Sequence, residues 1–265
     1  MLHSAGFDFE VEARSPDNPP MVLLHGSSGR ETDWTDFAEQ VAPNSTCFKV
    51  RGPIACEHGF TFFRRNRDRS LSLEELTDRA AKLCVFVETI TREYRLAQRP
   101  LIAGYSSGAI IAAAVVCRRC TLTSGAILLR PQSPDPQTPF PRLERYPVLI
   151  LAGAHDDRRE RYDAPVIKEQ FRIAGANVAY HLLDAGHDWE PTGLARALSK
   201  EWFASLFHEA SGKTRLSKPG RRPFGVGNDA KRSLQSAKIS RDDPEMTQEK
   251  AIAPTRQSAA TPPAR

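Results

Sequence analysis

The residue best suited to nucleophilic chemistry is Ser106, at the centre of Gly104-Tyr-Ser106-Ser-Gly108. In this G-x-S-x-G pattern, a serine at a tight strand-to-helix turn exposes its hydroxyl above a sheet. The apolar run 101–105 before it and the Ala/Ile-rich run 107–118 after it supply the strand and the helix that the turn requires. Glycines on either side leave room for the chain to reverse. We therefore predict that Ser106 is a catalytic nucleophile.

A serine nucleophile needs a general base and an acid that orients this base. His187 is the candidate base, because it follows the apolar run 178–183 in a glycine-containing loop. Asp156 is the candidate acid and follows the apolar run 147–153. Asp157 is the alternative, since a shift of one residue in this loop would exchange the two carboxylates.

Two backbone amides are candidates for an oxyanion hole. The N–H of Ser107 lies at the first helical position, where no intrahelical partner exists. The N–H of Ser27 follows the pair His25-Gly26, at the end of the apolar run 21–25. A position at a strand end favours a structural role for His25 over a role as base.

The elements that must position these residues alternate along the chain. We predict strands over 21–25, 46–51, 101–105, 125–129, 147–153 and 178–183, and helices over 33–41, 73–97, 107–118, 164–174 and 191–207. This alternation predicts an α/β class with a mostly parallel sheet and helices on both faces. The alternating segment 6–13 is expected to be an antiparallel edge strand.

The net charge of +5 divides the chain into two parts. Residues 1–210 contain 25 Lys/Arg and 27 Asp/Glu, whereas residues 211–265 contain 12 and 5. The second part is rich in Pro, Gly and Ser and has too few apolar residues to form a core. We predict a catalytic domain over 1–210 and a disordered basic tail over 211–265. We expect weak binding of polyanions by this tail and no specific nucleic-acid partner.

Other features bear on compartment and cofactors. The sequence contains no run of about 18 apolar residues, so we expect no membrane span. Its first residues lack the features of a secretory signal. Five scattered cysteines fit a reducing compartment, so we expect a cytoplasmic location. Cys117-x-x-Cys120 lies in an apolar helical run without a second ligand pair, so we expect ordinary helix cysteines, no metal and no cofactor.

Together these motifs resemble the compact carboxylesterase/lysophospholipase/acyl-protein thioesterase branch of the α/β-hydrolase superfamily. The resemblance spans roughly residues 7–207 and rests on LLHGSSGRETDW, RGPIACEHGFTFFRR, GYSSGA, LAGAHDD and AGHDW. It implies the α/β-hydrolase fold, the chain order serine, aspartate, histidine and a minimal cap. Such relatives often carry Asn where Ser107 stands, so the resemblance implies no particular substrate. They often lack Trp at position 189, and we expect Trp189 to narrow the mouth of the site.

These observations predict a serine hydrolase that cleaves carboxylic esters or thioesters of small molecules through an acyl-enzyme. A dienelactone-hydrolase-like enzyme and a non-catalytic binding module on the same scaffold are the alternatives. The sequence predicts no oligomeric state. Arg64 and Arg65 have two interpretations, as a solvated face or as a site for an acidic leaving group or a lipid phosphate.

Overall fold

One mixed sheet organises the chain. The computed structural model describes residues 1–14 and 18–214, and within them eight strands pair in the order β1-β2-β4-β3-β7-β8-β9-β10. Their bounds are β1 Leu2–Ser4, β2 Phe7–Glu12, β3 Met21–Leu24, β4 Cys47–Val50, β7 Leu101–Tyr105, β8 Ala126–Leu129, β9 Pro147–Gly153 and β10 Asn177–Leu183. The strands from β4 to β10 in this order are parallel, whereas β1 and β2 pair antiparallel. A separate hairpin consists of β5 (Ile54–Cys56) and β6 (Gly59–Thr61).

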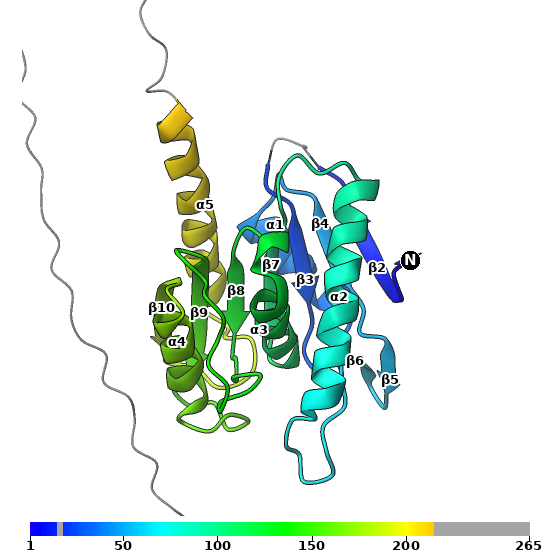
Figure 1. The fold of residues 1–265 in the computed structure, drawn as a ribbon, viewed down its shortest axis with the longest axis vertical. Coiled ribbons are helices and arrows are strands. Elements are labelled where there is room, and N and C mark those ends of the chain that lie inside the picture. Colours follow the sequence, from blue (N-terminus) through cyan, green and yellow to red (C-terminus); the bar gives the residue numbers. More distant parts are fainter. Residues whose placement is uncertain (15–17, 215–265) are drawn as a thin grey trace, which may run out of the picture. The chain divides into compact units, whose positions relative to one another are not determined.

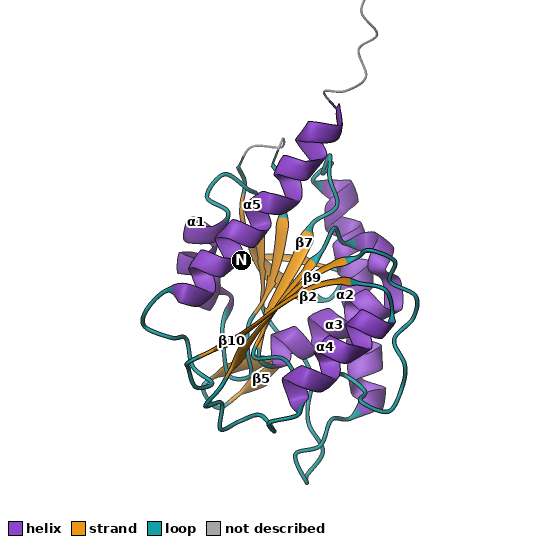
Figure 2. Cartoon of the chain, turned by 90° about the vertical axis from the view of Figure 1, so that its left-hand side faces the viewer, coloured by secondary structure: helices purple, strands orange, loops and turns teal. Residues whose placement is uncertain are grey.

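Helices cover both faces of this sheet, as Figures 1 and 2 show. One face carries α2 (Leu73–Glu93), α3 (Ser107–Arg119) and α4 (Asp163–Ile173), and the other carries α1 (Thr35–Val41) and α5 (Leu194–Thr214). Two 3-10 helices, η1 (Glu31–Trp34) and η2 (Cys120–Leu122), lie in the connections. All four residues of β3, β4 and β8 are buried, as expected for parallel strands covered on both faces.

Local sequence explains why the longest helix of the first face forms. The Ser72 side chain caps α2 by accepting a hydrogen bond from the Glu75 amide at 3.4 Å. Leu76, Leu83 and Ile90 recur at helical spacing and are buried against the sheet. The helix therefore follows from a cap and one apolar stripe.

The sequence-based expectations for the fold are confirmed in their main features. Each predicted strand and helix is present. As expected, β2 runs antiparallel to its neighbour β4, but β1 and not β2 forms the edge of the sheet. The described chain has no helix between β8 and β9, in agreement with a minimal cap. Sequence reasoning missed β1 and the β5–β6 hairpin.

The carboxyl-terminal part is described only as far as α5. This helix continues to Thr214, so the predicted boundary at residue 210 falls within it. Residues 215–265, most of the predicted basic tail, lie outside the described residues. Among the residues described, no helix is long and apolar enough to cross a membrane.

Candidate active site

The turn between β7 and α3 holds Ser106 in a strained backbone conformation. Its φ of 54° and ψ of −113° are unusual for a residue with a side chain. A Cβ atom at Gly104 would lie 2.2 Å from the Gly108 carbonyl oxygen, and one at Gly108 would lie 2.0 Å from that of Leu24. Both glycines are therefore needed for the chain to reverse this tightly.

The loops after β9 and β10 are tied together by their backbones. The Ala154 amide donates to the Leu183 carbonyl at 2.8 Å, and the His155 amide donates to the Ala185 carbonyl at 3.0 Å. Because these bonds continue the pairing beyond the strand ends, they bring the loop that carries Asp156 beside the loop that carries His187.

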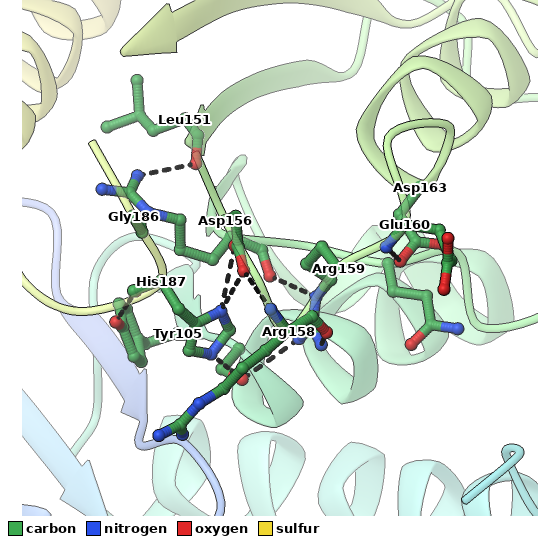
Figure 3. Close-up of polar contacts among 12 residues, drawn as sticks. Tyr105, Leu151, Asp156, Arg158, Arg159, Glu160, Asp163, Gly186 and His187 are labelled. Atoms are coloured by element: carbon green, nitrogen blue, oxygen red, sulfur yellow. Dashed lines mark hydrogen bonds and ion pairs between the residues drawn. The ribbon is translucent and has the colours of Figure 1, made fainter. Parts of the chain in front are cut away.

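The three predicted catalytic side chains form one continuous hydrogen-bonded chain (Figure 3). His187 Nε2 lies 2.8 Å from Ser106 Oγ, and His187 Nδ1 lies 2.8 and 2.9 Å from the two carboxylate oxygens of Asp156. This network fits a tautomer in which Nδ1–H donates to the carboxylate and Nε2 accepts from the serine hydroxyl. The side chains of His187 and Asp156 are each 4% exposed, whereas Asp157 is exposed and makes no bond to His187 among the described residues.

The electrostatic surroundings favour a neutral His187. Burial lowers the pKa of this imidazole below its ordinary value of 6.5, and the nearby Arg159 and Arg158 act in the same direction. The carboxylate of Asp156 opposes this shift without cancelling it. At neutral pH, Nε2 is therefore free to accept a proton.

Side chains from the sheet hold the His187 loop in place. The Tyr105 hydroxyl donates to the His187 carbonyl, and Nε of the buried Arg130 donates to the Gly186 carbonyl at 2.8 Å. The Trp189 ring stacks on Tyr105 at 4.8 Å between centroids and lines the hollow in front of Ser106. These contacts fix the imidazole relative to the serine.

The predicted oxyanion amides lie next to Ser106. Neither the Ser27 amide nor the Ser107 amide has a hydrogen-bond acceptor among the described residues, and both residues line the same hollow as Ser106. The His25 side chain lies against the loop that carries Ser27. Its Nε2 accepts from the Gly52 amide at 2.9 Å, and its Nδ1 donates to the Gly26 carbonyl at 2.7 Å. Burial lowers the pKa of His25, and both its ring nitrogens are occupied in bracing the loop.

The β5–β6 hairpin supports the loop after β3, residues 25–30, from the other side. The Phe60 amide donates to the Gly29 carbonyl at 2.9 Å, and a Cβ at Gly59 would lie 2.4 Å from the Ser28 carbonyl oxygen. Arg51 before the hairpin makes a bidentate pair with Glu31, at 2.7 and 2.5 Å. Sequence reasoning found this segment only as part of a resemblance; its two glycines, Gly52 and Gly59, were the available signal.

Arg159 is a site residue that sequence reasoning missed. Its Nη2 donates to Ser106 Oγ at 3.1 Å, so the serine oxygen contacts both an imidazole and a guanidinium (Figure 3). The available signal was an arginine pair directly after the two aspartates, but the sequence does not show how that loop turns.

Other residues considered from sequence lie away from this arrangement. Cys117 and Cys120 are free thiols at the end of α3 and in η2, and burial raises the pKa of Cys117 to about 12. No group of three or more His, Cys, Asp or Glu side chains suited to a metal ion occurs in the described part of the chain.

The mostly parallel sheet, with a strained serine turn after β7, defines the class of protein. The chain belongs to the α/β-hydrolase superfamily. It is 28% identical over 185 residues to a Bacillus subtilis protein named "Putative hydrolase MhqD", covering 69% of this chain and 91% of that relative. No protein-family model matches.

Solved structures of two bacterial enzymes share this fold. A carboxylesterase from Bacillus cereus is 28% identical with a TM-score of 0.71, covering 76% of this chain and 95% of that one. A carboxylesterase from Mesorhizobium loti is 25% identical with a TM-score of 0.71, covering 77% and 97%. The similarity thus extends over nearly the whole length of both relatives.

Proposed function

We propose that this chain is a serine hydrolase that cleaves carboxylic esters through an acyl-enzyme on Ser106. The observation that carries the proposal is the hydrogen-bonded chain from Ser106 through His187 to Asp156, in which both histidine nitrogens lie within 2.9 Å of their partners. The two carboxylesterases with the same fold support esters as the substrate class.

In the proposed reaction, Ser106 Oγ attacks the ester carbonyl while His187 Nε2 takes the hydroxyl proton. Asp156 stabilises the resulting imidazolium, and the amides of Ser27 and Ser107 donate to the negative oxygen of the tetrahedral intermediate. His187 then gives the proton to the leaving alcohol, and the acyl group stays on Ser106. A water molecule, deprotonated by His187, releases the carboxylic acid and restores the serine.

The same steps would cleave a thioester, because the leaving group needs only the proton on His187. A non-catalytic binding module is disfavoured, since such a protein has no need of an assembled triad behind a strained serine. A dienelactone-hydrolase-like enzyme is the other alternative; those enzymes typically carry cysteine where Ser106 stands.

The test is hydrolysis of short p-nitrophenyl esters by purified variants. Ser106→Ala should lower kcat by about 10⁶, because the remaining groups do not act without a nucleophile. Asp156→Asn should lower kcat by about 10⁴, because the imidazole loses its orienting acceptor. Asp157→Asn is the matched control and should retain activity within a few-fold. Substantial ester hydrolysis by Ser106→Ala, or a larger loss in Asp157→Asn than in Asp156→Asn, would contradict the assignment.

A further inference from the structure

The surroundings of Ser106 differ on its two sides. A hollow of about 520 Å³ is lined on one side by the aromatic rings of Trp34, Tyr105 and Trp189. A second hollow, of about 580 Å³, is lined by arginines. Both hollows reach Ser106 and His187, and both have the size of ordinary small-ligand sites. The two halves of a bound ester therefore meet different chemistry.

Arg159 is the innermost cation of the second hollow and has only uncharged partners. Its Nε donates to the Arg130 carbonyl at 2.9 Å, its Nη1 to the Arg158 carbonyl at 3.1 Å and its Nη2 to Ser106 Oγ at 3.1 Å. A guanidinium has five N–H groups, so two remain for a ligand. Within the described residues, no carboxylate lies within 4.0 Å of this side chain. A partly buried cation without a counter-ion is unfavourable unless a ligand supplies one.

Arg65 contributes a second unpaired cation to the same hollow. Its guanidinium donates to the Arg69 carbonyl at 2.9 Å and to the Gln132 side-chain oxygen at 3.0 Å. Burial lowers the pKa of Arg159, and the positive charge of Arg65 lowers it further. The two guanidinium groups are therefore close enough to repel each other, which an anion between them would relieve.

Acidic residues also face this hollow and offset part of its charge. Asp163, at the start of α4, is half-buried, and its carboxylate accepts from the Glu160 amide at 2.9 Å. Asp157 and Glu160 are exposed at the rim. None of these acids forms an ion pair with Arg65 or Arg159 in the described structure. Asp156 and Asp163 attract Arg159 at long range, and Asp163 also attracts Arg65, but this attraction leaves the donors of both arginines available.

We propose that the arginine side of the site binds a free carboxylate on the substrate, so that the preferred substrates are short esters with a second, unesterified carboxyl group. The inference rests on the proposed ester hydrolysis at Ser106. Because Arg159 contacts the nucleophile itself, the carboxylate must lie within about three or four bonds of the reacting carbonyl. A guanidinium fork binds a carboxylate in two-point fashion, which would also orient the ester over Ser106.

The test compares charged and neutral esters of matched size. One pair places the charge in the acyl half, with mono-p-nitrophenyl succinate against p-nitrophenyl butyrate. The other pair places it in the leaving group, with the acetyl ester of glycolate against that of glycolamide, where the carboxylate lies about three bonds from the reacting carbonyl. We expect the unaltered protein to favour the charged member of one pair in kcat/KM, and the pair that responds identifies the half that faces the arginines.

Variants connect this preference to the arginines. Arg159→Gln should lower the charged-to-neutral ratio of kcat/KM about tenfold or more, which is the effect expected from losing a charged hydrogen-bond donor. Arg65→Gln should lower the same ratio, and this second variant tests the carboxylate site even if Arg159→Gln does not fold. Arg161→Gln is the matched control, because this exposed arginine of the same loop lies over the Tyr162 ring and does not line the hollow.

The outcomes separate this inference from the proposed function. Hydrolysis of the neutral esters without a charged preference in either pair, or with an unchanged ratio in Arg159→Gln and Arg65→Gln, overturns the carboxylate site and leaves the hydrolase intact. Failure to hydrolyse any of the four esters contradicts the proposed function. Calorimetric titration with succinate needs no turnover: binding that weakens in Arg159→Gln supports the carboxylate site, whereas absent or unaltered binding overturns it.

Discussion

At the scale of single residues, the site depends on a histidine that stays neutral beside two cations. His187 donates to Asp156 through one ring nitrogen and accepts from Ser106 through the other. An acidic partner alone would raise the pKa of the imidazole, which would leave more of it protonated and unable to act as base. Burial and the neighbouring arginines outweigh that effect.

This balance predicts the pH dependence of activity. Only neutral His187 accepts a proton, so activity is lost as pH falls through its pKa, which burial holds below 6.5. The acid limb of kcat/KM for a neutral ester should therefore have an apparent pKa below 6.5. Arg159→Gln removes one cation that lowers this pKa, so the limb should move to higher pH. A limb above 6.5 in the unaltered protein, or a downward shift in the variant, would show that this electrostatic description is wrong.

At the scale of elements, the turn between β7 and α3 is held by backbone packing that admits no side chain. Gly108→Ala would place a Cβ 2.0 Å from the Leu24 carbonyl oxygen, and backbone cannot move aside as a side chain can. Adding atoms to a well-packed region typically lowers the unfolding free energy by about 1–3 kcal/mol. We expect Gly108→Ala to reach or exceed the upper end of this range and to lose ester hydrolysis.

Gly186→Ala is the control for this prediction. A Cβ there meets only the His155 carbonyl oxygen, at an ordinary 3.6 Å, although the residue directly precedes His187. Thermal or denaturant unfolding of both variants, compared with the unaltered protein, measures the difference. Equal stability of the two variants would mean that close packing at Gly108 does not hold the turn.

The sequence predicts an element well where its apolar residues follow a regular spacing or form a continuous run, or where the element adjoins a recognisable motif. The buried four-residue runs of β3 and β8 and the apolar stripe of α2 define their structure locally. The hairpin of β5 and β6 is different, because each strand has three residues and the pattern of burial does not alternate along β5. The hairpin is held by contacts with the loop at residues 25–30, which is distant from it in sequence.

Site residues divide in the same way. Ser106, Asp156 and His187 each follow an apolar strand, and this position, together with the G-x-S-x-G motif around Ser106, made them candidates. Arg159 lacked such a signal, since its approach to Ser106 depends on how the loop after β9 folds back over 53 residues of separation. Pairings of this kind are tertiary, and a single sequence does not reveal them.

At the scale of the whole molecule, the sheet gathers these loops at one edge. The loop that carries Ser27 follows β3, Ser106 follows β7, and Asp156 and His187 follow β9 and β10. Since these strands are parallel, their carboxyl ends lie together, where ligand sites form in open α/β sheets. Between β8 and β9 the described chain adds no helical cap above this edge, and two hollows reach Ser106 and His187 there.

Covalent labelling shows directly whether Ser106 is the nucleophile of a hydrolase. The purified protein is treated with a fluorophosphonate, which reacts with activated serines, and the modified peptide is identified by mass spectrometry. We expect one label per chain, on Ser106, no label in Ser106→Ala and a much slower reaction in His187→Ala. A label on another residue, or no label on a folded protein that hydrolyses esters, would contradict this assignment.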